Sequence, residues 1–383
     1  MGDAFAQQLS ELLPEIRERR AEIERARRLP DDLVEALARA GIFQRGVPRA
    51  LGGDEADPLE LMRIMETIAE ADGSTGWCSM IAIGNGVVAG YMKEAGAKEV
   101  FADQARPTAG LAAPNGTAEP VDGGYRVSGS WKYASGIDHC DWVWAGCVMV
   151  EEGSPRMTPM GPELVQVFLP VAEGRVDDTW FASGLRGTGS NDLTVEGAFV
   201  PESRVFSLFD LTTHRPEPLF QVPVLALFST HIAVVAIGIA RAAVDEFTSL
   251  ARDKVPSFSA ARLVDKPVTH VEIARAEAAL GGARALLYDV VDDLWDTVTA
   301  GRPSTSRQNA LCRIASVHAS ETAARVTATM STLGGGAALD SSSSLQRHAR
   351  DAQAVTHHVT QSPQLWEEGG RVLMGLEPLF PLF

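Results

Sequence analysis

The sequence predicts an α+β protein with several domains, in which a β domain separates two helical regions. Apolar residues recur at helical spacing through the first hundred residues and again from about Pro223 onward, whereas short alternating runs fill the segment between them. A length of 383 residues leaves room for two or three domains of ordinary size. We expect an N-terminal α-helical domain over 1–106, a central β domain over 107–215 and a C-terminal four-helix bundle over 216–383.

The first domain is expected to hold five helices joined by short loops. Pro30 favours the start of the second helix and Gly41 its end. The tripeptide Gly73-Ser74-Thr75 is expected to separate the third helix from the fourth. Apolar residues spaced by about 3.6 positions place these helices over 5–28, 32–40, 59–71, 76–92 and 95–103.

The middle segment, from about Pro107 to Phe206, has the pattern of a β barrel or sandwich. Asp122-Gly123-Gly124 stands between two alternating runs and predicts a hairpin turn. Further strands are expected over 142–150, 164–169 and 193–200. The segment has the length of an ordinary domain.

Helical spacing returns in the last third. Four long amphipathic stretches predict an antiparallel bundle, with helices over 228–252, 268–300, 306–333 and 344–360. The most apolar stretch, 222–240, is interrupted by Ser229, Thr230 and His231. It therefore suits a buried helix better than a membrane span.

Composition narrows the classes of partner and compartment. A formal net charge of −16 argues against nucleic acid and anionic membranes as partners. Residues 2–24 lack the apolar core of a signal peptide, so a cytoplasmic protein is expected. Cys78, Cys140, Cys147 and Cys312 form no CxxC pair, which favours buried thiols in a reducing compartment over disulfides.

Several common chemistries find no motif in this chain. HExxH, GxSxG and P-loop patterns are absent. The glycines over 184–189 suggest a nucleotide loop, yet they lie between predicted strands and open no helix, so a dinucleotide fold is not expected. His357 and His358 are adjacent and would point about 100° apart on a helix, so no metal site is predicted.

Two polar and aromatic patterns suggest a flavin site. Trp131, Tyr133 and Ser135 alternate along one predicted strand, and Thr188 and Ser190 show the same alternation. Alternating side chains share a face, which would supply an aromatic wall and hydroxyl donors to an isoalloxazine ring. The spacing alone describes equally well a tryptophan and a tyrosine that pack a barrel core, so both interpretations stay open.

The chain resembles the acyl-CoA dehydrogenase superfamily over nearly its whole length. It is most similar to the flavin-dependent monooxygenases that share this fold, the group D two-component aromatic hydroxylases. The residues that carry the resemblance lie at 71–77, 128–142, 187–192, 199–202 and 238–241, and at Arg350-Asp351 followed by His358.

The resemblance implies a homotetramer with flavin held between the β domain and the bundle and completed by a neighbouring subunit. Gly335, Gly336 and Arg350 resemble the family's contribution to phosphate or ribose binding, and Arg186 joins Thr188, Ser190 and the strand residues in the expected cofactor site. An ordinary turn between helices remains the alternative for the glycine run.

The resemblance allows either a dehydrogenase or a monooxygenase, and the lack of a catalytic carboxylate base distinguishes between them. Acyl-CoA dehydrogenases remove a substrate proton with a glutamate, and Val359 stands where most of that family has it. The second known location, within 221–240, contains no Asp or Glu. Dehydrogenation is therefore disfavoured. The alternatives left open are a desaturase with a displaced base, an N-hydroxylating monooxygenase of the same fold, and a fold relative without catalysis.

The favoured function is the oxygenase component of a two-component flavin-dependent monooxygenase. The resemblance implies that a separate NAD(P)H:flavin reductase delivers FMNH2 or FADH2, which reacts with O2 to a C4a-hydroperoxide that hydroxylates an aromatic or natural-product substrate. Ser135 would support the flavin N5 region, and Trp77 and Trp131 would shape the cavity. His358 would donate a proton or bind the substrate oxygen, unless it is an ordinary helix histidine.

Asn85 stands where several phenol hydroxylases of this branch have a histidine. An amide cannot take a phenol proton, so a substrate that reacts without deprotonation, such as an indole, a polycyclic ring or an amine, is favoured over a simple phenol. A local structural role for the amide stays open. Asp138 and His139 are interpreted as a pair that rigidifies a turn. The predicted catalytic residues are Ser135, His358 and Asn85, and the predicted substrate-binding residues are Trp77, Asn85, His231 and His358.

Overall fold

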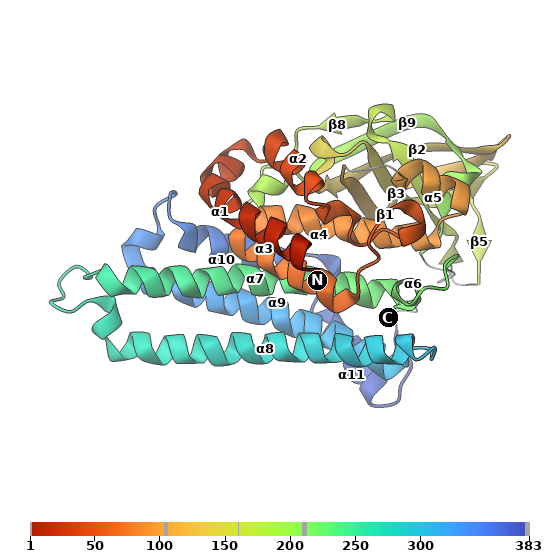
Figure 1. Ribbon diagram of the computed structural model, residues 1–383. Helices are drawn as coiled ribbons and strands as arrows, with labels where there is room; N and C mark the ends of the chain where they lie inside the picture. The colour runs from red at the N-terminus through yellow and green to blue at the C-terminus, as the bar shows by residue number, and fades with distance from the viewer. Residues whose placement is uncertain (1, 103–105, 160, 209–212, 380–383) are drawn as a thin grey trace.

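The computed structural model describes residues 2–102, 106–159, 161–208 and 213–379. The long helices of the C-terminal part lie at the bottom of Figure 1 and the sheet lies at the upper right. Of the N-terminal helices, α3 and α4 lie between them, and α1 and α2 lie at the upper left. This arrangement confirms the predicted fold class of helical N-terminal and C-terminal parts around a central sheet.

The N-terminal helices follow the predicted pattern with one correction. They are α1 (Asp3–Ala26), α2 (Asp31–Arg39), α3 (Pro58–Ala71), α4 (Gly73–Val88) and α5 (Glu94–Phe101). The tripeptide 73–75, expected to separate two helices, is instead the first turn of α4. The cause is Asp72, whose Oδ1 accepts hydrogen bonds from the backbone N–H of Thr75 at 2.8 Å and from its hydroxyl at 2.9 Å. An aspartate in this position satisfies donors that open a helix, so three weak helix formers become helical.

The central segment forms a mixed sheet. Its main strands are β1 (Thr108–Val121), β2 (Gly124–Ala134), β3 (Trp142–Glu151), β7 (Leu164–Pro170), β8 (Arg175–Asp177), β9 (Asn191–Pro201) and β10 (Val205–Phe206), and shorter ones are β4 (Ser154–Pro155), β5 (Met157–Thr158) and β6 (Gly161–Pro162). The order across the sheet is β10-β7-β3-β1-β2-β9-β8, with β1 parallel to β3. Asp122 and Gly123, the latter at φ 76°, connect β1 to β2, so the predicted hairpin is confirmed.

The C-terminal part contains the four predicted long helices. Its helices are α6 (Pro218–Gln221), α7 (Val224–Asp253), α8 (Pro267–Thr299), α9 (Ser306–Gly334), α10 (Ser344–Val355) and α11 (Gln364–Leu373). The last of the predicted four was expected to reach residue 360, yet it stops at Val355. His358 adopts an extended conformation, and its side chain accepts a hydrogen bond from the backbone N–H of Thr360, which starts the short helix η10 (Val359–Gln361).

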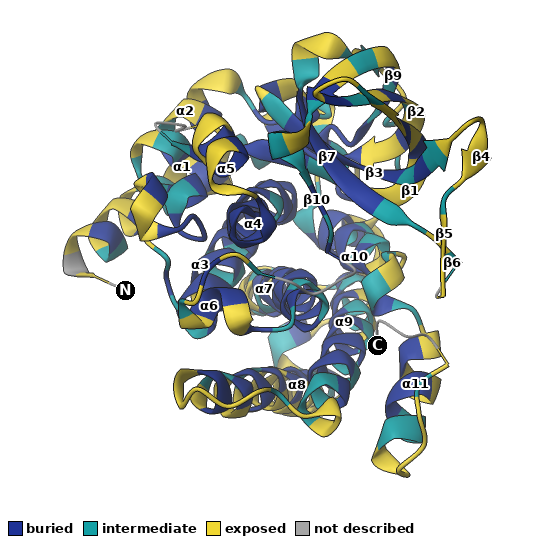
Figure 2. Ribbon diagram, turned by 90° about the vertical axis from the view of Figure 1, so that its right-hand side faces the viewer, coloured by how far each residue is buried: buried dark blue, intermediate teal, exposed yellow. Residues whose placement is uncertain are grey.

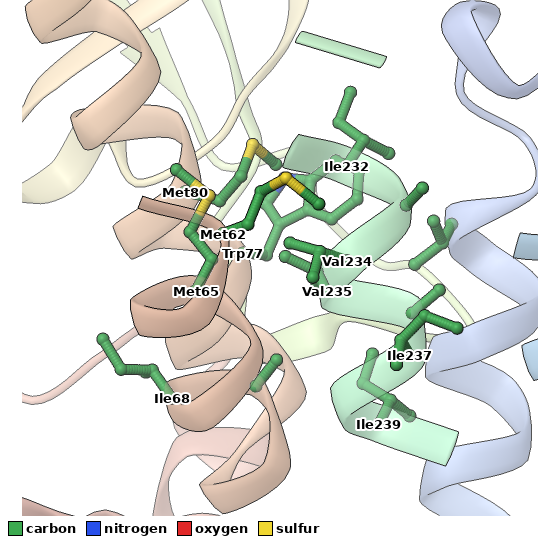
Figure 3. Packing of buried hydrophobic residues seen from close by; sticks show 14 of the residues in the cluster. Met62, Met65, Ile68, Trp77, Met80, Ile232, Val234, Val235, Ile237 and Ile239 are labelled. Carbon is green, nitrogen blue, oxygen red and sulfur yellow. The ribbon is translucent and has the colours of Figure 1, made fainter. Parts of the chain in front are cut away.

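Helices from both ends of the chain share one core. Side chains of α3, α4 and α7 interlock there, as Figure 3 shows for Met65, Met80 and Val235 among others. Two glycines permit this approach, because a Cβ on Gly76 would lie 2.5 Å from Ala69 of α3 and one on Gly238 would lie 2.4 Å from the carbonyl oxygen of Glu66. A separate cluster fills the sheet. Figure 2 shows α4 buried between the sheet and the other helices, and its Val88 belongs to a third cluster that includes Trp144 and Phe168 of the sheet.

Helix α7 is long and apolar enough to cross a membrane by length and composition. However, 83% of its most apolar window is buried inside the protein. It lies beside α3, α9 and α10 (Figure 2). Its hydrophobicity is thus explained by its place at the centre of the helical core.

Candidate functional site

Three predicted hydroxyl residues meet at the edge of the sheet. Ser190 Oγ lies 2.7 Å from Ser135 Oγ and 2.6 Å from Thr188 Oγ1, and the three hydroxyls are buried. The indole N–H of Trp77, on α4, donates to Ser135 Oγ at 3.0 Å. We call Ser135, Thr188 and Ser190 the hydroxyl network. The sequence therefore located groups that the fold brings together from the end of β2, the loop before β9 and helix α4.

The backbone around this network is shaped by left-handed residues. Tyr133 has φ 71°, and the register between β2 and β9 shifts next to it. Gly136 and Gly189 adopt φ 74° and 52°, a region that suits glycine, and the Gly136 N–H donates to the Thr188 carbonyl at 2.8 Å. A tyrosine at positive φ is uncommon, and such residues gather at functional sites.

The expectation that Trp131, Tyr133 and Ser135 share one face is wrong. Trp131 is fully buried within the sheet, and its indole N–H donates to the Gly146 carbonyl at 2.7 Å. Tyr133 is 64% exposed, on the opposite side. The bulge at Tyr133 breaks the two-residue period on which the expectation depended. Trp131 therefore packs the core of the sheet and does not wall an open cavity.

An exposed aromatic surface lies beside the network. The Tyr133 and Trp180 rings meet edge to face with centroids 5.9 Å apart. Phe181 is 71% exposed, with the guanidinium of Arg27 at 4.1 Å from its ring centroid. Sequence reasoning missed Trp180 and Phe181, although their place directly before the glycine loop at 184–189 is a usable signal. We call Tyr133, Trp180 and Phe181 the aromatic surface.

Two predicted histidines approach this region from the helical side. The His358 ring meets the Trp77 indole at 5.9 Å between centroids, with planes 65° apart. Its Nδ1 accepts from the Thr360 N–H at 3.2 Å, and burial lowers its pKa to about 4, so the ring is neutral at pH 7. The contact with Trp77 connects His358 to the hydroxyl network through a single side chain.

His231 is fully buried on α7, and its surroundings are unusual. Neither ring nitrogen has a hydrogen-bond partner among the residues that the structure describes. Burial lowers its pKa to about 3. A Cβ on Gly84 of α4 would lie 4.0 Å from His231 Nδ1, so this glycine leaves space next to the ring. A buried imidazole without a partner is costly, and such groups are explained by a ligand or by water.

The side chain of Asn85 is hydrogen-bonded to the sheet. Its Nδ2 donates to the Thr108 carbonyl at 2.7 Å, and its Oδ1 accepts from the Trp144 indole N–H at 2.7 Å. Both ends of the buried amide thus hold α4 against β1 and β3. One amide N–H and one oxygen lone pair are thus used for structure, and the catalytic and substrate-binding roles of Asn85 stay predictions.

The predicted phosphate-binding residues are spread apart. Arg350 binds the Ser183 carbonyl, Glu24 and Gln346, so its guanidinium holds the glycine loop to α1 and α10. Arg186 Nε lies 3.7 Å from the same glutamate. Gly335, at φ 58°, and Gly336 follow α9, and a Cβ added at either would meet no atom within 4 Å. The two glycines therefore present open backbone, whereas Arg350 is engaged within this chain.

Asp351 is a buried carboxyl to which the sequence analysis gave no role of its own, although it belongs to the Arg350-Asp351 pair that carries the resemblance. Its Oδ1 accepts from the Leu185 N–H at 2.6 Å, and a Cβ on Gly73 would lie 3.3 Å from Oδ2. Burial raises its pKa to about 7. It anchors the loop that carries the hydroxyl network. Within the described ranges, no group of three His, Cys, Asp or Glu residues is placed to hold a metal ion.

These groups fit the requirements of a flavin. An isoalloxazine ring needs apolar contacts and a few placed polar groups, and the exposed rings of the aromatic surface beside the hydroxyl network supply groups of both kinds. The unpartnered His231 nitrogens add a polar site on the helical side. The pocket directly beneath Ser135 has room for about one water molecule, so a tricyclic ring would lie against the outer aromatic side.

Comparison with known proteins identifies the family of this chain. Residues 4–104 match the family model of the acyl-CoA dehydrogenase N-terminal domain, and 230–363 match that of the C-terminal domain. Indole-3-acetate monooxygenase of Pseudomonas putida is 34% identical over 95% of this chain and 92% of its own length. The flavin-dependent monooxygenase oxygenase subunit HsaA of Rhodococcus jostii is 33% identical over 94% of each chain.

Solved structures give the same result. The 3-HSA hydroxylase of Rhodococcus sp. RHA1 superposes with a TM-score of 0.92 over 100% of both chains at 30% identity. XiaF of Streptomyces sp., solved with FADH2 and glycerol, reaches 0.91 over 98% of this chain and 96% of its own at 26% identity. The chain belongs to the flavin-dependent monooxygenases of the acyl-CoA dehydrogenase fold, as an oxygenase component that uses reduced flavin and O2 and depends on a separate reductase.

Proposed function

We propose that this oxygenase hydroxylates an electron-rich aromatic ring that reacts without losing a proton, with an indole as the first candidate. The observation that carries the proposal is the amide of Asn85, which cannot accept a phenol proton and which is bonded to the Thr108 carbonyl and the Trp144 indole N–H. His231 and His358 are held neutral by burial, and among the residues that the structure describes no carboxylate forms an ion pair with either ring to strengthen it as a base. A phenol gains reactivity from deprotonation, whereas an indole is nucleophilic as it stands.

Reduced flavin supplies the activation of O2 when it is bound. The residues of this chain would do the rest. Tyr133 and Trp180 would lie against the ring system, and Ser135 would donate or accept at the N5 edge. Trp77 fixes Ser135 by its indole N–H and meets His358 with its face, so it couples the cofactor side to the substrate side.

His231 is the group proposed to orient the substrate. A neutral imidazole has one donor and one acceptor nitrogen, and either would bind a polar atom of a bound aromatic, such as the N–H of an indole. A Cβ at Gly84 would lie 3.4 Å from the Phe228 ring and 4.0 Å from His231 Nδ1, so binding of such a ring beside the imidazole would require Phe228 to move. The indole-3-acetate monooxygenases of Pseudomonas putida and Acinetobacter baumannii, 34% and 32% identical, support an indole-bearing substrate.

The test supplies the purified protein with NADH, FMN or FAD and a generic flavin reductase under 18O2. Indole-3-acetate and a matched phenol, 4-hydroxyphenylacetate, are compared as substrates. We expect 18O in the indole product and more product per NADH from the indole than from the phenol. Ser135→Ala should lower product per NADH about tenfold or more and release hydrogen peroxide instead. A phenol that is hydroxylated as well as the indole would overturn the proposal.

We also propose a cytoplasmic homotetramer with domain limits at 1–106, 107–215 and 216–383. Exposed apolar side chains support the assembly, since Val268 and Val271 on α8 and Met374 after α11 are about half exposed or more. The open backbone of Gly335 and Gly336 is suited to reach a neighbouring subunit's cofactor. Light scattering coupled to size exclusion tests this, and a monomer that binds flavin at full affinity would refute it.

A further inference from the structure

The aromatic surface stands on a stretch of chain that the sheet does not hold. Residues 178–185, all of them described, follow β8 and form neither helix nor strand. Trp180 and Phe181 therefore depend for their positions on side chains that reach this stretch from elsewhere. Asn191 at the start of β9 is one of them, because its Oδ1 accepts from the backbone N–H of Thr179 and of Trp180, each at 3.2 Å.

Arg27 holds the same stretch from the side of α1. Its guanidinium forms a bidentate pair with the Asp178 carboxylate, with N–O distances of 2.8 and 2.9 Å, and Nη1 also donates to the Trp180 carbonyl at 3.0 Å. The guanidinium carbon lies 4.1 Å from the centroid of the Phe181 ring. A planar guanidinium suits this arrangement, since it can form two parallel bonds to a carboxylate while its face lies on an aromatic ring. One side chain thus binds Asp178, Trp180 and Phe181 at once.

Arg27 is itself held in place by the fold. It ends α1 at φ 57°, the left-handed conformation that commonly closes a helix. Ile23, one turn earlier, is buried in the helical core, so the last turn of α1 is a fixed support. A Cβ on Gly189 would lie 3.2 Å from the Arg27 carbonyl oxygen, which places the end of α1 against the glycine loop. The guanidinium therefore reaches the aromatic surface from a well-anchored element.

The pair between Arg27 and Asp178 should contribute little to overall stability. The two side chains are 22% and 64% exposed, and ion pairs at such positions are screened by water. The effect of the pair is local instead, since a stretch without helix or strand opens when its few side-chain contacts are lost. A binding site that is formed in only a fraction of the molecules binds its ligand more weakly by that fraction.

We propose that Arg27 is a positioning residue of the flavin site, which fixes residues 178–181 and so places Trp180 and Phe181 against a bound isoalloxazine ring. The guanidinium acts through these residues, because Asp178 and the Trp180 carbonyl engage both of its terminal nitrogens. The inference rests on the proposed contact of the aromatic surface with the flavin.

The test compares the free protein with its complex with chemically reduced FMN or FAD under anaerobic conditions. Quenching of tryptophan fluorescence gives the dissociation constant of the reduced flavin, and hydrogen exchange followed by mass spectrometry reports the opening of residues 178–185. For Arg27→Gln we expect a dissociation constant about tenfold higher than in wild type and faster exchange of this stretch in the free protein. Arg27→Lys keeps the charge without the bidentate geometry and should fall between the two. The Tm should change little in either variant.

Asp178→Asn separates positioning from simple charge attraction. Reduced flavin nucleotides are negatively charged at neutral pH, so loss of the Asp178 charge would strengthen their binding if Arg27 acted by charge alone. Under the proposal the variant binds more weakly, because the bidentate pair is lost. The matched control is Arg19→Gln, because Arg19 forms the same kind of pair with Asp32, at 2.8 and 2.9 Å, and that pair joins α1 to α2. The control should keep the wild-type dissociation constant and exchange.

Three results would overturn the inference. They are wild-type affinity and exchange in both Arg27→Gln and Asp178→Asn, tighter binding by Asp178→Asn, and an equal loss of affinity in Arg19→Gln. Asp178→Asn decides the matter by itself if Arg27→Gln does not fold. Hydroxylation of indole-3-acetate by wild type is measured in parallel, and absence of product there would overturn the proposed function instead.

Discussion

Asn85 on α4 and His231 on α7 are both buried polar residues of the helical core, yet their surroundings differ. Each end of the Asn85 amide has a partner at 2.7 Å. Neither His231 nitrogen has one in the described part of the chain. A paired group is stabilised where it is, and an unpaired one destabilises the fold unless a ligand or water completes it. The comparison shows that two buried polar residues of one core can differ in their partners, and this difference is why we propose a ligand for His231.

Asp351 is a third buried polar residue, and unlike Asn85 it can become charged. We expect the largest change in the free energy of unfolding from its substitution. Its folded pKa of about 7 lies above the ordinary value of 3.8, so the folded protein holds this proton more tightly than the unfolded chain. Below about pH 4 both states are protonated, and stability is not reduced. From about pH 4 to 7 the unfolded chain ionises first, and stability falls by up to about 4 kcal/mol.

Asp351→Asn should remove this fall, because the amide oxygen still accepts from Leu185 and cannot ionise. Urea unfolding at pH 4 and pH 8 measures the free energy of unfolding. The variant should match wild type at pH 4 and exceed it at pH 8. Asp340→Asn, an exposed aspartate, is the control and should change neither value by much. A variant that is less stable at pH 8 would mean that the charged carboxylate is itself stabilised by its surroundings.

Asn85→Leu removes both hydrogen bonds of the paired residue. The leucine fills similar space but leaves the Trp144 N–H and the Thr108 carbonyl buried without partners. Each costs about 1–3 kcal/mol, so the free energy of unfolding should fall by about 3 kcal/mol. Urea unfolding measures the loss, and the folded variant should keep wild-type product per NADH. If stability were unchanged and substrate binding were lost, Asn85 would belong with His231 as a ligand-binding group.

The sequence predicted the features that depend on neighbouring residues. It did not predict contacts between residues that are far apart in the chain. Helical spacing and the turn at residues 122–124 are local, and they located the helices and the hairpin. The alternation at Trp131 and Tyr133 failed because a bulge, invisible in the residue pattern, turns one side chain out. The engagement of Asn85 depends on Trp144, 59 positions away, so no local pattern could reveal it. Ser135, Thr188 and Ser190 were found because each follows a strand or glycine turn that the pattern marks.

His231→Leu replaces the residue that has no hydrogen-bond partner among the described residues. It should have the smallest effect on stability at neutral pH. A neutral imidazole without partners costs about 1–2 kcal/mol, so the leucine should stabilise the protein by that amount at pH 8. The folded pKa of about 3 lies below the ordinary 6.5, so the unfolded chain takes up a proton before the folded protein does. The free energy of unfolding of wild type is therefore unaffected by this histidine's titration above pH 6.5 and falls as the pH is lowered from 6.5 toward 3. The advantage of the variant should therefore grow below pH 6.5, in urea unfolding followed from pH 8 to 5.

The same variant should bind the aromatic substrate more weakly, because the polar partner proposed for it is gone. Equilibrium titration of the flavin-loaded protein with indole-3-acetate measures the dissociation constant, and a rise of about tenfold is expected for one lost hydrogen bond. His231→Gln keeps a donor and an acceptor and should retain part of the affinity. Gain of stability with loss of affinity is the signature of a group kept for its ligand. Loss of both would show instead that His231 has a structural partner and that the contrast with Asn85 does not hold.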